Sequence, residues 1–261
     1  MPTSVINAAK DRLAAGELAL GIILRQARTV DIAPAMKACG YDWLFLDLEH
    51  NSMDLDTAVQ ISVAALGVGI APIVRVPAGQ SWMATRVLDG GALGIVMPHV
   101  DTPEEAKAIA AALRYPPHGH RSVAGGLPHL RYEKHPLAET CAAINAATMI
   151  IVMLETPLAI RNADAIAAVP GIDSLLIGTN DLAMELGVPG GFGDERIVAA
   201  YRAVVDACRN HGKHAGVGGI ADQALLKRYI EMGVRLVLPG SDLAFLQSAA
   251  SATAAAMRGF L

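Results

Sequence analysis

The chain has 261 residues, of which 53% are hydrophobic, and a formal net charge of -4 at pH 7. A chain of this length can bury a large core, and α/β barrels of this size commonly form one domain, so we expect a single domain over residues 1–261. The scattered lysines and arginines form no basic stripe that would follow phosphates. This argues against nucleic acid as a partner.

Cys39, Cys141 and Cys208 are widely separated and odd in number, which fits neither a disulfide framework nor a zinc site. The N-terminus reaches Lys10 without the apolar core of a signal peptide, and no run approaches the roughly 20 apolar residues of a membrane-spanning helix. We therefore expect a cytoplasmic protein that is neither secreted nor inserted in a membrane.

Apolar runs and amphipathic patterns alternate along the chain. An N-terminal helix is predicted over residues 3–17, with Thr3 or Ser4 as its cap. The apolar runs predict eight strands, over residues 19–24, 43–49, 71–76, 94–99, 149–154, 174–178, 213–217 and 236–238. Helices are predicted over residues 30–39, 55–66, 82–88, 103–113, 137–146, 159–168, 195–210, 221–232 and 242–257. Eight such units with short connections favour a closed (β/α)8 TIM barrel over an open sheet.

Two segments depart from this regular alternation. Residues 115–129 are too rich in proline and glycine for regular structure, and so long a loop in a compact domain is usually functional or mobile. We expect it to serve as a lid or as a contact between subunits. The C-terminal helix over residues 242–257 is rich in alanine, and it either packs against another subunit or faces solvent.

Charged and titratable residues gather where the predicted strands end. They are Asp47, Glu49 and His50 after the second strand, Arg75 near the end of the third, His99 after the fourth, Glu155 after the fifth, and Asp181 after the sixth. In a barrel these ends converge on one mouth, which is where such folds place their chemistry. One acid at a strand end is more often a helix cap or a surface ion pair, but so many groups aimed at one mouth favour a functional site.

Glu155 and Asp181 are the predicted metal pair, because two carboxylates from adjacent strands supply the hard oxygen ligands that suit Mg²⁺ or Mn²⁺. Two protein ligands would leave about four positions of an octahedral ion for water and substrate, as a Lewis-acid catalyst requires. Alternatively, Asp181 caps a helical turn that begins at Leu182.

Arg75 lies in an otherwise apolar strand, so it must pair with a carboxylate or point into a polar mouth. Its structural interpretation is an ion pair with Glu49 or Asp47, and its functional interpretation is a cation for a developing oxyanion. His50 follows Asp47 by three residues, and a carboxylate that orients an imidazole makes it an effective base near neutral pH.

The ordered combination of these residues with further motifs carries a family resemblance. The motifs are Asp47-Leu-Glu-His50, Arg75, Leu88-Asp-Gly-Gly-Ala-x-Gly94, Tyr115-Pro-Pro-x-Gly-x-Arg121, Glu155-Thr156 and Gly178-x-x-Asp-Leu182. Together they resemble the HpcH/HpaI family of metal-dependent pyruvate aldolases over nearly the whole chain. The resemblance implies a (β/α)8 barrel, a dimer-based homo-oligomer that can reach a hexamer through its C-terminal helix, and reversible cleavage of a 4-hydroxy-2-oxo acid, such as 4-hydroxy-2-oxoheptanedioate or 2-dehydro-3-deoxyglucarate, to pyruvate and an aldehyde.

The same resemblance implies a role for each matching residue. Glu155 and Asp181 would bind a divalent cation, Mg²⁺ or Mn²⁺ with Co²⁺ as a third option. Arg75 would hold the keto oxygen as it becomes an enolate, and His50, oriented by Asp47, would transfer protons. Two groups of residues complete the implied site: Glu49 and Asp89 as holders of metal-bound water, and the backbone amides around Gly178 and Asn180 as contacts of the pyruvate carboxylate.

The other aldolase chemistry is disfavoured, because a Schiff-base enzyme needs a lysine inside the mouth and no lysine follows a predicted strand there. Three positions depart from the family pattern. Met153 stands where many relatives have glutamine, Ile23 and Leu24 where an aromatic residue is common, and Ser122 where glycine is usual. The enolate machinery is thus intact, while the aldehyde and the exact 2-oxo acid stay open.

Two alternatives to an aldolase remain. One is an oxaloacetate decarboxylase or a related lyase that uses the same enolate. The other is a non-catalytic barrel that binds a metabolite, which would tolerate replacement of His50 or Arg75 without loss of turnover.

Overall fold

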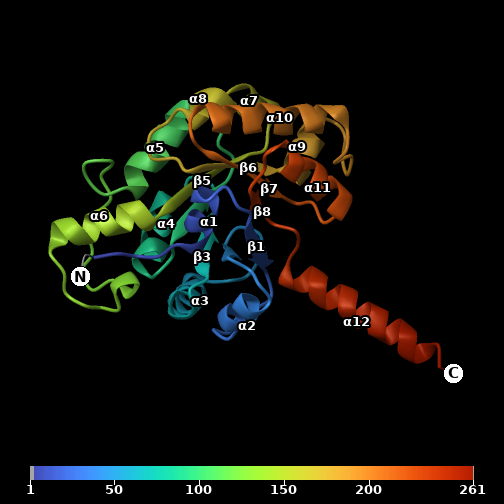
Figure 1. Cartoon of the computed structure of the whole chain (residues 1–261), viewed down its shortest axis with the longest axis horizontal. Coiled ribbons are helices and arrows are strands. Elements are labelled where there is room, and N and C mark those ends of the chain that lie inside the picture. The colour runs from blue at the N-terminus through green and yellow to red at the C-terminus, as the bar shows by residue number, and fades with distance from the viewer. Residues whose placement is uncertain (1–2, 261) are drawn as a thin grey trace.

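The computed structural model describes residues 3–260, and within them eight parallel strands form a closed barrel in the order β1 to β8 (Figure 1). The strands are β1 (Ala19–Leu24), β2 (Trp43–Asp47), β3 (Ala71–Arg75), β4 (Gly94–Met97), β5 (Met149–Leu154), β6 (Ser174–Gly178), β7 (His214–Gly218) and β8 (Leu236–Val237). Ala19 lies opposite Leu236, which closes the sheet between β1 and β8. The predicted (β/α)8 barrel is confirmed.

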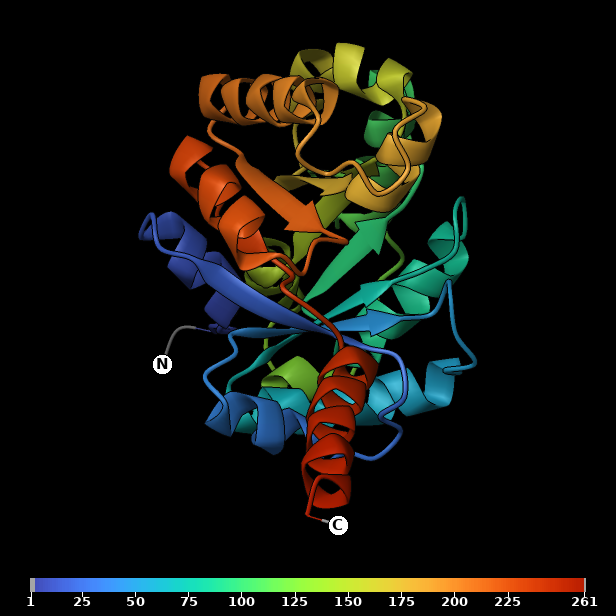
Figure 2. The same ribbon diagram turned by 90° about the vertical axis from the view of Figure 1, so that its right-hand side faces the viewer.

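Helices surround this barrel (Figure 2). They are α1 (Ala8–Ala14), α2 (Ile32–Ala38), α3 (Leu55–Val68), α4 (Ser81–Asp89), α5 (Pro103–Leu113), the 3₁₀ turn η1 (Pro128–Leu130), α6 (Leu137–Ala147), α7 (Pro157–Arg161), α8 (Ala163–Ala167), α9 (Thr179–Glu185), α10 (Glu195–Asn210), α11 (Gln223–Met232) and α12 (Asp242–Arg258). The helix predicted over residues 159–168 is two short helices, α7 and α8, which meet at Asn162.

The N-terminal helix is shorter than predicted, and its cap is Asn7 rather than Thr3 or Ser4. The Asn7 carboxamide accepts the backbone N–H of Lys10 at 3.2 Å. Its Nδ2 donates to the carbonyl oxygens of Leu93 at 3.1 Å and of Ala147 at 2.8 Å. These long-range bonds fix where the helix begins and attach α1 to the end of the barrel where the strands start.

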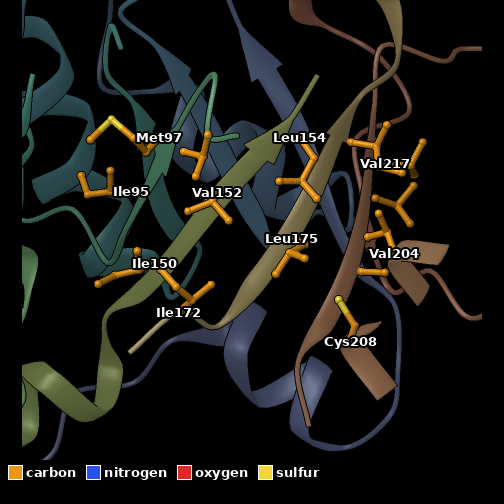
Figure 3. Close-up of a cluster of buried hydrophobic side chains, with 14 of the residues drawn as sticks. Ile95, Met97, Ile150, Val152, Leu154, Ile172, Leu175, Val204, Cys208 and Val217 are labelled. Carbon is orange, nitrogen blue, oxygen red and sulfur yellow. The ribbon is translucent and has the colours of Figure 1, made fainter. Parts of the chain in front are cut away.

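The strands contribute to two apolar layers because successive side chains alternate between the faces of a sheet. One layer includes Phe45, Ile73 and Met153 and contains few helix residues, so it fills the barrel interior. The other joins outward-facing strand residues to helices, as where Val217 and Leu175 lie beside Val204 and Cys208 of α10 (Figure 3). The parity of a strand residue therefore decides whether it faces the interior or the helices.

The irregular segment over residues 115–129 lies at the end of the barrel where the strands start. His129 donates from Nε2 to the carbonyl oxygen of Ala92, just before β4, at 2.9 Å. Arg114, which precedes the segment, donates from Nη2 to the carbonyl oxygen of Gly171, just before β6, at 2.9 Å. Within one chain this segment does not cover the strand C-termini, so the lid prediction is wrong for the single chain. A subunit contact stays a prediction.

α12 extends away from the barrel, and none of its residues is buried (Figure 1). Its first residue, Asp242, accepts the backbone N–H groups of Arg25, Gln26 and Ala27 at 3.0, 2.8 and 2.8 Å. The helix is thus attached to the barrel directly after β1. In the part of the chain that the structure describes, no helix combines the length and apolar character needed to cross a bilayer.

Candidate active site

Three charged residues from β2, β3 and the end of β5 face the interior of the barrel. Asp47, Arg75 and Glu155 each lie two positions after a side chain of the interior apolar layer. Because parallel strands all end at the same side of the barrel, the three side chains enter one mouth. All three are buried, so their charges must be balanced by one another or by a ligand.

Arg75 and Asp47 form a bidentate ion pair. Arg75 donates from Nε to Oδ1 of Asp47 at 2.9 Å and from Nη2 to Oδ2 at 2.7 Å. Oδ1 also accepts the backbone N–H groups of Glu49 at 3.1 Å and His50 at 3.3 Å. Burial alone would raise the pKa of the Asp47 carboxyl, but Arg75 and these two amides together hold the pKa below its ordinary value. The ion pair suggested by the sequence is confirmed.

The imidazole of His50 is not oriented by Asp47, contrary to the prediction. Arg75 occupies both Asp47 oxygens, and Asp47 meets His50 only through the backbone N–H. The nearest acid to the ring is Glu49, whose Oε2 lies 3.7 Å from Nε2 of His50. The His50 side chain is 51% exposed at the mouth, which leaves it accessible to substrate and water.

Glu49 lies between Arg75 and two histidines. Its Oε2 is 3.1 Å from Nη1 of Arg75, and its Oε1 is 3.8 Å from Nε2 of His99. Oε2 is buried and makes no hydrogen bond within residues 3–260. The carboxylate therefore faces the mouth with acceptor capacity to spare, as the prediction of a water-holding acid requires.

Glu155 is the most deeply buried acid on the far side of the mouth, with 2% of the residue exposed. Its Oε2 accepts the backbone N–H of His99 at 2.9 Å and lies 3.2 Å from the ring Nδ1 of His99. Burial raises the pKa of the Glu155 carboxyl, the charges of Asp181 and Glu49 add to the rise, and His99 opposes it. His99 has a φ of 53°, a left-handed conformation that is rare outside glycine and is concentrated at functional sites.

The turn from β6 into α9 brings Asp181 to Glu155. Thr179 anchors the turn, because its buried hydroxyl donates to the carbonyl oxygen of Gly218 at 2.7 Å and lies 2.6 Å from the hydroxyl of Tyr201. Asp181 is exposed in the first turn of α9, where N–H groups still lack helical partners. The cap of α9 is Gly178, so Asp181 is not the N-cap.

Gly178 makes room for the Glu155 carboxylate. A Cβ at position 178 would lie 2.4 Å from Oε1 and 2.6 Å from Cγ of Glu155, well inside van der Waals contact. The next residue but one, Asn180, is similarly close to Gly219, where a Cβ would lie 2.6 Å from its Nδ2. Gly178 on β6 thus leaves space for the side chain of Glu155, and Gly219 after β7 leaves space for that of Asn180.

We expect Gly178→Ala to displace Glu155 and to weaken divalent-metal binding and turnover by about 10- to 100-fold, the usual effect of disturbing the support of a ligand. Titration of Mn²⁺ and kinetic assays measure both effects. Gly67→Ala is the matched control, because a Cβ at position 67 meets no atom within 4 Å. Equal metal affinity in the two variants would contradict this role of Gly178.

Asp89 does not join the mouth within one chain. It is the last residue of α4, at the opposite end of the barrel, and its Oδ1 accepts a hydrogen bond from Nη2 of Arg121 at 2.6 Å. Arg121 in turn stacks over the ring of Tyr115 at 4.5 Å. A helix that precedes a parallel strand ends where that strand begins, so the fold itself separates Asp89 from the strand C-termini.

The donor set fits a hard divalent cation. Glu155 and Asp181 supply carboxylate oxygens. Burial first, and then the charge of Asp181, raise the pKa of Glu155, and a bound cation would favour its ionised form. Within residues 3–260 no group of three or more histidine, cysteine, aspartate or glutamate side chains is arranged to hold a metal. Two carboxylates alone match a site that leaves positions open for water and substrate better than a closed structural site.

Arg25 at the mouth was not singled out from the sequence. It is the first charged residue after β1, and its Nε lies 3.8 Å from Oδ2 of Asp47. The signal that identified Asp47, a charge directly after an apolar strand, applies equally to Arg25.

Comparison with known proteins agrees with this geometry. The family model described as HpcH/HpaI aldolase/citrate lyase matches residues 24–249. The chain is 38% identical over 234 residues to 4-hydroxy-4-methyl-2-oxoglutarate aldolase of Hapsidospora irregularis, covering 88% of this chain and 86% of that protein. It is 33% identical over 243 residues to 5-keto-4-deoxy-D-glucarate aldolase of Escherichia coli O6:H1 (strain CFT073), covering 93% of each.

The fold agrees as closely. The crystal structure of an HpcH/HpaI aldolase from Desulfitobacterium hafniense DCB-2 superposes with a TM-score of 0.92 at 26% identity, covering 97% of both chains. The family is metal-dependent, and relatives 33–38% identical support a class II pyruvate-type aldolase that cleaves 4-hydroxy-2-oxo acids. The predicted carbon–carbon lyase is confirmed at this level. The chain belongs to the HpcH/HpaI aldolase/citrate lyase family.

Proposed function

We propose that this mouth cleaves a 4-hydroxy-2-oxo acid reversibly to pyruvate, or a close 2-oxo acid, and an aldehyde or ketone. The 4-hydroxyl loses its proton, the bond between C3 and C4 breaks, and its electron pair passes to C3 to give the enolate of the oxo acid. A proton then returns to C3. The observation that carries the proposal is that Glu49 lies 3.1 Å from Arg75 while the charges of Glu49 and Asp181 both act on Glu155, which supports one shared mouth for the cationic and acidic groups.

Glu155 and Asp181 would hold the divalent cation, Mg²⁺ or Mn²⁺ with Co²⁺ as a third option. When bound, the cation supplies Lewis-acid polarisation of the keto oxygen. The buried position of Glu155 supports this role, because a nearby cation keeps its carboxylate ionised. Glu49, whose buried Oε2 makes no hydrogen bond among the described residues, is suited to hold water beside the acids.

Arg75 is suited to the enolate oxygen because its orientation is already fixed. A guanidinium has five N–H groups, of which Nε and Nη2 each donate one to Asp47. Nη1 faces Glu49 and also the sulfur of Met153, 4.0 Å away. Since a thioether is a weak acceptor, this side of Nη1 retains an N–H for a developing oxyanion, which is the geometry that electrostatic catalysis requires.

His50 is the proposed proton-transfer group. Its ring is exposed at the mouth and close to Glu49, while Asp47 fixes the backbone from which the ring projects. The backbone amides around Gly178 and Asn180 would receive the oxo-acid carboxylate, because amides at the start of α9 lack helical partners. This gives the reaction a cation on one side and a base on the other.

Retro-aldol assays over a panel of 4-hydroxy-2-oxo acids with Mg²⁺, Mn²⁺ and Co²⁺ test the proposal. We expect metal-dependent release of pyruvate from at least one member, and no release after chelation. Decarboxylation of oxaloacetate without any retro-aldol cleavage would contradict the aldolase assignment in favour of a related lyase. Turnover unchanged in His50→Ala would contradict the assignment of the proton-transfer group.

Assembly and location complete the proposal. α12 carries exposed apolar side chains, including Phe245, Leu246 and Met257, and none of its residues is buried. This supports a dimer-based homo-oligomer, up to a hexamer, in which α12 packs against another copy. The free cysteines Cys39 and Cys208 are consistent with a reducing, cytoplasmic location.

A further inference from the structure

Arg25 stands level with the catalytic ion pair on the interior face of the barrel. Ile23 packs against the interior apolar layer, so Arg25, two positions later, has the same parity. The last registered pair between β1 and β2 joins Leu24 to Leu46, and Arg25 is therefore opposite Asp47. The mouth thus carries two arginines, Arg25 and Arg75, on either side of Asp47.

Within residues 3–260 the guanidinium of Arg25 has one long ion pair and no hydrogen bond. Its Nε lies 3.8 Å from Oδ2 of Asp47, beyond hydrogen-bond distance, and Asp47 is already satisfied by Arg75 at 2.7 and 2.9 Å. That Nε is buried without a hydrogen-bond partner, although 42% of the side chain is exposed. No hydrogen bond from this guanidinium is found within residues 3–260. A buried donor without a partner is costly, and an anionic ligand would satisfy it.

The base of this side chain is held in place. The backbone N–H of Arg25 donates to Asp242 at 3.0 Å, and its carbonyl oxygen accepts from Nη1 of Arg28 at 2.8 Å. Arg28 also donates to the carbonyl oxygen of Ala27 at 3.0 Å, so its guanidinium is already engaged. Of the two arginines in this loop, Arg25 is therefore the one whose guanidinium can bind a ligand. Its fixed backbone reduces the entropy lost on binding.

The barrel places Arg25 across from the acids. In a ring of eight strands β1 is diametrically opposite β5, which Glu155 follows, and Asp181 follows the adjacent β6. If the 2-oxo acid end of a substrate lies at Glu155 and Asp181, an extended substrate that crosses the mouth brings its other end to β1 and β2. A planar carboxylate at that end matches the fork of a guanidinium.

We infer that Arg25 is a specificity-determining residue that binds a second, distal carboxylate, so that the enzyme prefers 4-hydroxy-2-oxo dicarboxylic acids over their monocarboxylic analogues. The inference rests on the proposed function, because it requires the oxo acid end of the substrate to lie at the acids. It adds a partner for the aldehyde half of the substrate, which the departure at Ile23 and Leu24 had left open.

The test compares two substrates that differ only at the distal end, 4-hydroxy-2-oxoheptanedioate and 4-hydroxy-2-oxoheptanoate. In Arg25→Gln we expect kcat/KM for the diacid to fall about 10- to 150-fold, the effect of losing a hydrogen bond to a charged group. The value for the monoacid stays unchanged. Arg25→Lys keeps the charge and retains part of the preference. Arg202→Gln, which removes an exposed charge on α10, leaves both values unchanged.

A binding readout without turnover accompanies the kinetics. Titration with 2-oxoglutarate and 2-oxopentanoate, which differ by the terminal carboxylate, is expected to show that Arg25→Gln weakens only the diacid. Equal loss on both substrates, or no loss on either, would overturn the inference. Metal-dependent exchange of the pyruvate C3 protons separates the two proposals: if wild type lacks exchange and cleavage, the proposed function fails, whereas normal exchange with no preference for the diacid defeats only the role of Arg25.

Discussion

Arg75→Met is expected to lower turnover of a 4-hydroxy-2-oxo acid by at least about 10²- to 10³-fold, the effect of removing one donor to a developing oxyanion. The same change leaves the fully buried Asp47 carboxylate without its bidentate partner. Breaking a buried pair from one side costs about 3–5 kcal/mol, so the free energy of unfolding should fall as well. Steady-state kinetics and urea unfolding measure the two effects separately.

The double variant Asp47→Asn with Arg75→Met distinguishes catalysis from folding. Asparagine keeps an oxygen for the backbone N–H groups of Glu49 and His50 but carries no charge to bury. We expect stability to recover toward that of the wild type while turnover stays lost. Recovery of turnover together with stability would show that Arg75 acts only by holding the fold, against the role proposed here.

Glu155→Gln is expected to abolish the stabilisation of the protein by Mg²⁺ or Mn²⁺ and to lower turnover by about 10³-fold or more, since a Lewis-acid cation supplies several kcal/mol of transition-state stabilisation. For the wild type, metal at 100 times its dissociation constant should add about 2.7 kcal/mol to the free energy of unfolding. Thermal unfolding with metal and with chelator measures the difference.

Glutamine suits this test because it is isosteric with Glu155 and its side-chain oxygen can still accept the N–H of His99. The metal-free variant should be at least as stable as the wild type, since burial penalises the charged carboxylate. Glu185→Gln, an exposed substitution at the end of α9, is the control and should keep the full metal response. A metal response retained in Glu155→Gln would remove this residue from the metal site.

The barrel could be predicted from the sequence because the patterns that mark its strands are local. Each strand is an apolar run bounded by glycine, proline or charge, and interior parity then selects the residues of the mouth. Asp47, Arg75 and Glu155 satisfy both conditions. Arg25 also satisfies both, and the alternation from Ile23 would have identified it.

The remaining differences come from tertiary contacts that no local pattern encodes. Asn7 begins α1 because carbonyl groups of the barrel bind its amide. Asp47 forms hydrogen bonds with Arg75 rather than with the imidazole of His50, because the guanidinium offers two parallel donors, which an imidazole lacks. The role of Asp89 was inferred from the family resemblance alone. In the structure Asp89 is the last residue of α4, so within one chain it lies at the end of the barrel opposite the mouth.

We propose that Arg75, Glu155 and Asp181 act together at one mouth to form the enolate of a 2-oxo acid. Solvent exchange of the pyruvate C3 protons in D₂O, followed by NMR, tests it most directly because it requires no knowledge of the aldehyde. We predict exchange by the wild type with Mg²⁺, Mn²⁺ or Co²⁺, none after chelation, and none in Arg75→Met or Glu155→Gln. Absence of exchange by the wild type with all three metals, or exchange that persists after chelation, would contradict the account.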